Sequence, residues 1–223
     1  AVSTFENAGT VRKSGGAETS SIEAMFHNTG TVEVQSGTLS LSQGGTSDGS
    51  FMAGIGTVLD FHGGVHTLEA SSQVSGTGQT LFSGGTTEVG GSYAVAGETA
   101  ITGGTVNFSS GTPITTGALT LWGTSTGGTL TGSDTVTVTG ITTWTGGTMT
   151  GSGQTVAQGG MEIGDGNYKY LDGRTLINEE TATMTGTLTH RYLGLRNGAL
   201  LRNEVGATFD FQSDAYFHYH AGA

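Results

Sequence analysis

The sequence predicts an all-β fold, a single-domain parallel β-helix (β-solenoid) of about 11 coils with roughly 20 residues each. Three observations lead to it: a composition rich in glycine and threonine, a repeat along the chain, and short segments in which polar and apolar residues alternate. We expect the domain to span residues 1–223, with less regular coils from about residue 161 to the C-terminus, and a right-handed course.

The composition excludes a helical protein. Glycine and threonine contribute 42 and 40 of the 223 residues, and the first is a poor helix former while the second is β-branched and favours strands. A single proline and the absence of a strict Gly-X-Y period exclude collagen, and the low proline and charge content argues against disorder. With no cysteine, disulfides and thiolate metal sites are excluded as well.

The charge of the chain excludes several partners. The net charge is −11, and the chain has only seven lysines and arginines. Nucleic acids and anionic membranes attract clustered basic residues, so we expect neither as a partner. No apolar run approaches the roughly 20 residues of a membrane span. Because no P-loop is present, we also expect no phosphate-bearing cofactor, and no other cofactor motif stands out.

The repeat is marked by paired glycines and by a second phrase. Gly-Gly pairs begin at positions 44, 63, 84, 103, 127, 146 and 159, and the last two pairs are closer together than the others. The phrase aromatic-x-Asn-x-Gly-Thr-Val occurs at 5–11 and again at 26–32, with degenerate copies near Asn178 and Asn203. A period of roughly 20 residues is typical of one coil of a solenoid.

The strands follow from alternation between the glycines. Alternating residues of a strand point to opposite sides of a sheet, so each segment has one apolar and one polar side. In chain order the segments are 31–34, 38–41, 57–61, 105–108, 119–121 and 135–138. We expect buried ladders formed by Val11, Val32, Leu39, Leu41, Leu59, Phe61, Val106, Phe108, Leu130, Val136 and Val138.

In stacked coils, residues about one period apart in the sequence come into contact. A sandwich would need recurring two-residue Asn-Gly or Asp-Gly hairpins, which do not follow the repeat. Parallel coils instead stack at about 4.8 Å, giving a rod on the order of 50 Å long. Residues one coil apart then become neighbours. We therefore predict an asparagine ladder between Asn7 and Asn28.

The phrases at 5–16, 26–41 and 174–178 resemble the β-strand-repeat regions of large bacterial surface and secreted proteins, which are filamentous-haemagglutinin-like and autotransporter-passenger-like chains. The likeness covers nearly the whole chain. It implies a β-solenoid, an extracellular or cell-surface location, and a role as adhesin, spacer or matrix component. Members of this group share no common catalytic residues, so the resemblance assigns none here.

Open solenoid ends predict self-association. The C-terminal phrase at 203–211 leads naturally into another copy of the N-terminal phrase at 5–11. An end that exposes strand edges and apolar side chains invites pairing. We expect either head-to-tail stacking of copies or tandem copies within a longer chain.

The catalytic candidates are Asp172, Arg191 and Asp210, which follow one another at two equal intervals close to the period of the repeat. One aligned column would alternate acid, base and acid, and paired carboxylates can hydrolyse glycosides. The alternative interpretation is a solvent-screened surface ladder, which stabilises little. We therefore regard the chain as non-enzymatic and keep this column as the alternative.

The metal candidates are His218 and His220, which are separated by one residue and would point the same way on a strand. Two imidazoles can chelate zinc or copper, but no third ligand is evident. The other four histidines are expected to be exposed residues of turns and chain ends. The sequence thus predicts no resident metal.

The ligand candidates are Trp122 and Trp144, which are about one period apart and are expected in adjacent coils. Exposed indoles stack on sugar rings, whereas buried ones belong to the core, which we favour here. The threonine-rich stretch 135–150 suggests flat threonine ranks of the kind that bind ice or solid surfaces, although the ranks break at Glu33, Asp60, Glu88 and Asn107.

Three functions remain open. The first is an extracellular structural or adhesin-type solenoid segment without enzymatic activity, whose partner is a glycan or a solid surface. The second is a polysaccharide-binding or polysaccharide-degrading β-helix. The third is an ice- or surface-binding solenoid.

Overall fold

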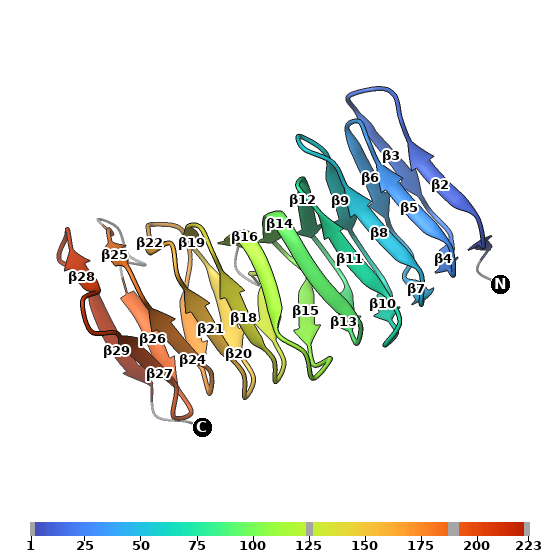
Figure 1. Cartoon of the computed structure of the whole chain (residues 1–223). Helices are drawn as coiled ribbons and strands as arrows, with labels where there is room; N and C mark the ends of the chain where they lie inside the picture. The colour runs from blue at the N-terminus through green and yellow to red at the C-terminus, as the bar shows by residue number, and fades with distance from the viewer. Residues whose placement is uncertain (1–2, 124–126, 187–191, 221–223) are drawn as a thin grey trace.

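The computed structural model describes residues 3–123, 127–186 and 192–220. Within them the chain forms 29 β-strands and no helix, and every strand pairing is parallel. The strands stack coil upon coil from the N-terminus to the C-terminus (Figure 1). The predicted all-β parallel solenoid is therefore confirmed. Accordingly, no helix with the length and apolar character of a membrane span is found in these ranges.

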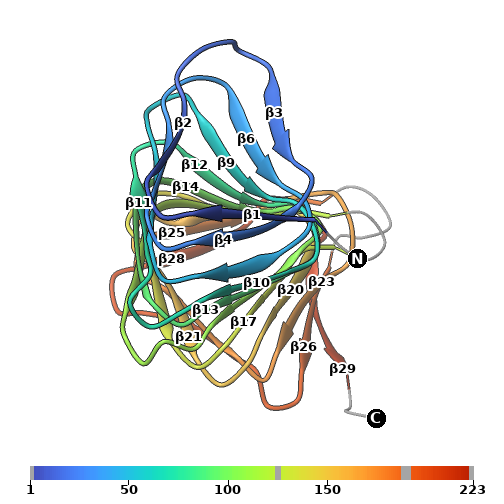
Figure 2. The ribbon, with the colours of Figure 1, turned by 90° about the vertical axis from the view of Figure 1, so that its right-hand side faces the viewer.

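Most coils contribute three strands, one to each side of the solenoid (Figure 2). Face 1 is an eleven-stranded sheet. Its strands are β1 (Thr4–Asn7), β4 (Met25–Asn28), β7 (Gly45–Ser47), β10 (Val65–Leu68), β13 (Thr86–Val89), β15 (Thr105–Phe108), β17 (Thr129–Thr131), β20 (Gly147–Thr150), β23 (Lys169–Asp172), β26 (Tyr192–Arg196) and β29 (Tyr216–His220).

The other two sides are formed by one eighteen-stranded sheet. Face 2 contains β2 (Thr10–Lys13), β5 (Thr31–Val34), β8 (Ser50–Ala53), β11 (Gln73–Gly76), β18 (Thr135–Val138), β21 (Gln154–Ala157), β24 (Thr175–Asn178) and β27 (Leu200–Asn203). Face 3 contains β3 (Thr19–Ile22), β6 (Thr38–Leu41), β9 (Val58–Phe61), β12 (Gln79–Phe82), β19 (Thr142–Trp144), β22 (Met161–Ile163), β25 (Thr181–Met184) and β28 (Thr208–Phe211). The long strands β14 (Ser92–Ile101) and β16 (Ile114–Leu121) run through both faces.

The paired glycines mark the corners, and their uneven spacing now has a structural reason. Six of the nine Gly-Gly pairs lie at or just before a strand of face 1, as at β7 and β20. The pairs at 15–16 and 90–91 precede β3 and β14, and the pair at 159–160 precedes β22 of face 3, which explains why it follows the pair at 146–147 so closely. Coil length also varies: Thr86 aligns with Thr105 and Thr105 with Thr129, so the second of these two coils is the longer.

The inward side chains form continuous ladders. On face 3 the aligned side chains of Phe61, Phe82, Ile101, Leu121 and Trp144 are all fully buried. Phe61 and Phe82 stack with ring centroids 5.4 Å apart. Of the eleven residues predicted to be buried, ten are, and Val11 in the first coil is half-buried. The inward and outward assignment from alternation is thus confirmed.

The predicted asparagine ladder is also confirmed. Asn7 donates its side-chain N–H to the Oδ1 of Asn28 at 2.8 Å, and both side chains are buried. The Oδ1 of Asn28 also accepts from the backbone N–H of Gly30 at 3.2 Å, which closes the turn. A Cβ on Gly30 would lie 2.1 Å from the carbonyl oxygen of Gly9 in the preceding coil. Close coil contact therefore explains the Asn-x-Gly phrase.

Several ionisable groups are buried within this polar and apolar stack, and His66 is one of them. Only 3% of His66 is exposed, and its Nε2 lies 3.2 Å from the carbonyl oxygen of Leu41. Its ring packs edge-on against Phe61. The expectation that histidines outside the C-terminal pair are exposed is therefore wrong for His66, because its strand β10 turns this position inward.

We expect acid to destabilise the protein partly through His66. Burial lowers the pKa of His66 from 6.5, while hydrogen bonds to Leu41 and Gly63 and the charge of Asp60 oppose this. Below about pH 6.5 the unfolded chain takes up a proton that the folded chain resists, so the free energy of unfolding decreases. Thermal melts of the wild type and of His66→Gln should diverge between pH 7 and pH 5, with the larger decrease in the wild type. Equal decreases would contradict this role.

Candidate functional site

The predicted catalytic column is not formed. Asp172 lies on β23 of face 1, where it aligns with Arg196. Asp210 lies on β28 of face 3 and aligns with Thr183. Arg191 lies outside the described residues. The prediction that Asp172 and Asp210 share one column is wrong, because the coils of this region are longer than the assumed interval and shift the register.

The two tryptophans lie in adjacent coils, as expected, but have different environments. Trp144 aligns with Leu121 on face 3 and is fully buried. Trp122 follows β16 directly, where the chain has left the strand, and 47% of it is exposed. The prediction of a core role is confirmed for Trp144 and is wrong for Trp122.

The histidine pair lies on the last strand of face 1. His218 aligns with Gly194, and His220 aligns with Arg196. The ring of His218 lies 5.5 Å from that of Tyr192. No group of three or more histidine or acidic side chains placed to hold a metal ion occurs within residues 3–123, 127–186 and 192–220.

A serine, histidine and aspartate cluster that the sequence did not reveal lies on face 3. Ser83 donates its hydroxyl proton to Asp60 at 2.6 Å, and the Nδ1 of His62 lies 2.9 Å from the Ser83 oxygen. Asp60 also accepts a hydrogen bond from Ser40 at 3.1 Å. In a nucleophilic triad the histidine takes the serine proton. Here Ser83 donates its hydrogen bond to Asp60 and not to His62, so the cluster links coils rather than activating Ser83.

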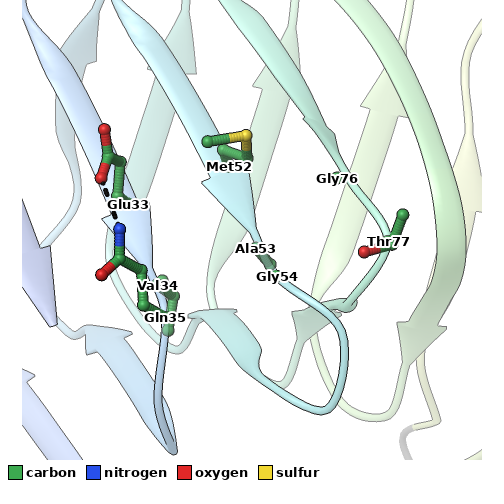
Figure 3. A pocket seen from close by; sticks show the side chains of 8 residues that line it. All are labelled: Glu33, Val34, Gln35, Met52, Ala53, Gly54, Gly76 and Thr77. Atoms are coloured by element: carbon green, nitrogen blue, oxygen red, sulfur yellow. Dashed lines mark hydrogen bonds between the residues drawn. The ribbon is translucent and has the colours of Figure 1, made fainter. Parts of the chain in front are cut away.

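A shallow depression of about 170 Å³ lies where face 2 ends (Figure 3). Met52 projects over it, and Gln35 donates to Glu33 at 2.9 Å on its rim. The hydrogen bond from Arg12 holds the pKa of Glu33 below its usual value. A carboxyl group that ionises this readily is a poor general acid at neutral pH. The depression therefore offers little catalytic chemistry.

The most distinctive surface is an aromatic cluster on the outer side of face 1, at its C-terminal end. We call it the aromatic face and define it as Tyr168, Tyr170, Tyr192, Tyr216 and His218. It spans three consecutive coils, those of β23, β26 and β29.

The rings of the aromatic face form a connected array. The ring centroids of Tyr168 and Tyr192 lie 6.0 Å apart, and those of Tyr192 and Tyr216 lie 5.8 Å apart. Tyr168 and Tyr170 stack with an interplanar angle of 9°. Tyr168 and Tyr216 expose 45% and 44% of their surfaces. An exposed, contiguous aromatic surface of this kind is typical of an interaction site.

Gly194 and Arg196 of β26 shape this surface. Tyr170, Gly194 and His218 are aligned in one column, and because the middle residue is glycine, no side chain lies between Tyr170 and His218. The guanidinium carbon of Arg196 lies 3.3 Å from the ring centroid of Tyr170, a cation–π contact. Burial and the neighbouring Tyr170 raise the pKa of Tyr192, so this phenol stays protonated at neutral pH. The aromatic face is therefore a connected array of rings with the guanidinium of Arg196 at its margin.

The sequence contains a signal for this site, three equally spaced tyrosines, but their spacing is longer than the assumed period of about 20 residues and was therefore missed. Tyr168, Tyr192 and Tyr216 follow one another at equal intervals, and this interval is the coil length in this region. Farther toward the N-terminus the outer column of face 1 consists of Thr86, Thr105, Thr129 and Thr148. The change from threonine to tyrosine at β23 marks where the aromatic face begins.

Comparison with known proteins adds no relative. No protein-family model, no curated protein and no solved structure matches the chain.

Proposed function

We propose that the chain is a non-enzymatic, extracellular structural segment of the adhesin type, in which a solenoid rod carries the aromatic face as its surface-interaction module. The observation that supports this most is the aromatic face itself, a cluster of exposed rings set on a regular parallel sheet. Successive coils stack through continuous parallel ladders, so repeated coils extend the rod along its axis. Such a rod can hold the aromatic face away from the point where the chain is attached.

An adhesion assay with coated beads tests this proposal. Beads carrying the chain should adhere to cell surfaces or biofilm material more than uncoated beads do, and the double variant Tyr168→Ala/Tyr216→Ala should lose most of that adhesion. Tyr219→Ala serves as the matched control, because Tyr219 is 78% exposed but occupies the opposite side of β29. Adhesion that is absent, or equal in all variants, contradicts the proposal. Release of reducing sugars from a polysaccharide would show an enzyme instead.

The second proposed partner is another copy of this chain, joined head to tail. At the N-terminal end a recess of about 330 Å³ is lined partly by Phe5, Val11 and Ile22. At the C-terminal end Phe211 and Phe217 pack with ring centroids 5.3 Å apart and remain 45% and 39% exposed. An exposed aromatic pair and a partly apolar recess at opposite ends (Figure 1) favour a heterologous contact.

Light scattering over a concentration series tests head-to-tail association. The average mass of the 223-residue chain should rise with concentration, because each contact leaves a new open end. Phe211→Glu/Phe217→Glu should remain monomeric, since it places charges in the contact. A wild-type mass that stays monomeric at every concentration contradicts the proposed contact.

A further inference from the structure

We propose that the aromatic face binds a neutral polysaccharide chain of β-linked pyranose units that lies along the solenoid axis. This inference rests on the proposed function and names the ligand class of the same surface. The faces of a pyranose ring carry C–H groups and its edge carries hydroxyls, so a sugar stacks on an aromatic ring while its edge remains polar. Tyrosine offers both an apolar ring and a polar tip for such a ligand.

The charges around the aromatic face favour a neutral ligand. The chain as a whole carries a net charge of −11, which repels nucleic acids and acidic polymers. Arg196 contacts the ring of Tyr170, and Asp172 on the preceding coil accepts a hydrogen bond from Asn197 at 2.6 Å. These planar polar groups border the rings. Sugar hydroxyls can add hydrogen bonds to such groups, whereas a lipid tail or an apolar protein surface would remove them from water without adding any hydrogen bond.

The spacing of the rings favours a repeating ligand. Tyr168, Tyr192 and Tyr216 come from three successive coils, and strands in neighbouring coils lie about 4.8 Å apart. One pyranose unit of an extended chain has a similar length, so successive sugars can follow successive coils. An open sheet surface accepts the extended ribbon of a β-linked chain better than the coiled shape of an α-linked chain.

The same sheet offers a continuation of the binding path. Tyr170 aligns with Thr148, and Thr148 aligns with Thr129 in the coil before it. A chain longer than the aromatic face would therefore pass from rings to threonine hydroxyls. Hydroxyls that remain well hydrated contribute less than stacked rings, so the tyrosines should carry most of the affinity.

Binding to a defined set of glycans tests the inference. We would measure retention of the 223-residue chain in affinity gels containing xylan or mixed-linkage β-glucan, sedimentation with cellulose, and retention in amylose gels as the α-linked comparison. We expect binding to the β-linked polymers and little to amylose. With soluble β-linked oligosaccharides, affinity should rise with each added sugar until the ligand spans the three coils, and rise little beyond that length.

Variants separate ring stacking from other causes. Tyr168→Ala and Tyr216→Ala should each weaken binding about two- to tenfold, while Tyr168→Phe/Tyr216→Phe should retain most of it because the rings remain. Tyr219→Ala is the matched control and should bind as the wild type does. Unchanged melting temperatures show that each variant is folded.

Three results would overturn the ligand assignment. The first is equal retention by amylose, and the second is glycan binding that persists when both tyrosines are alanine. The third is absence of glycan binding together with tyrosine-dependent adhesion of coated beads, in which case the interaction surface stands and its ligand is of another class. If adhesion is absent as well, the proposed function fails together with the ligand.

Discussion

Replacing Val106 with aspartate is expected to unfold the middle of the solenoid. Val106 is fully buried on β15 and aligns with Thr87 and Leu130 in the neighbouring coils. A carboxylate at this position loses its water without gaining a cationic partner, and we expect a loss of more than about 4 kcal/mol in the free energy of unfolding. For a chain of this size the melting temperature should fall by about 10 °C or more.

The control for Val106 lies on the same strand. Thr105 precedes it and turns its side chain to the outer surface of face 1. Thr105→Asp should therefore leave the melting temperature nearly unchanged, whereas Val106→Asp lowers it strongly. Calorimetric melts of the two variants measure the difference. Similar melting temperatures would mean that the core of this coil tolerates water, contrary to the buried ladder.

Replacing Arg174 with methionine is expected to produce the second large loss of stability. Arg174 is fully buried between β23 and β24, and its guanidinium reaches across three coils. It donates to the carbonyl oxygens of Gly132, Asp134, Thr150 and Gln154 at 2.8 to 3.1 Å, and to the hydroxyl of Thr155 at 2.9 Å.

The loss should be large because methionine fills the space but donates no hydrogen bond. Burial lowers the pKa of Arg174 to about 10, while the nearby charge of Asp134 opposes this, so the side chain is charged at neutral pH. Without it, five buried acceptors lose their donor and the Asp134 carboxylate loses a nearby positive charge, so we expect a cost of about 3 kcal/mol or more.

Two further variants test the Arg174 prediction. Lysine keeps the charge but lacks the planar fork, so Arg174→Lys should also be destabilised. Arg12 is more than half exposed and pairs with Glu33, so Arg12→Met should leave the midpoint of urea unfolding almost unchanged. If Arg174→Met unfolds at the same urea concentration as the wild type, the carbonyl groups must find other hydrogen-bond donors, contrary to the prediction.

Alternation and glycine spacing were sufficient to predict the strands and their buried sides. Phe108 and Val138 point inward because a strand places every second residue on the same side, a rule that needs no tertiary information. Asn7 and Asn28 were predicted to meet because their phrases repeat at a single coil length. Where the coil length is constant, residue type and the period are enough to predict which side chains of neighbouring coils meet.

The candidate site was predicted poorly because coil length changes in the region that contains it. The catalytic column assumed a constant period that would place Asp172 beside Arg191, but Asp172 aligns with Arg196, farther along the chain. The same change brings Tyr168, Tyr192 and Tyr216 together. Insertions at corners do not alter the alternation within strands, so the strand pattern conceals the shift in register.

By itself the sequence determined the all-β class, the parallel coils and the inward side of each strand, because these follow from backbone preference and from the alternation of side chains within strands. Only the tertiary structure decided which distant residues share a surface. Coil register depends on how many residues each corner contains, and the packing of strands against the neighbouring coil decides which residues form a strand and which a corner. The burial of Arg174 and the exposure of Trp122 are both results of that packing.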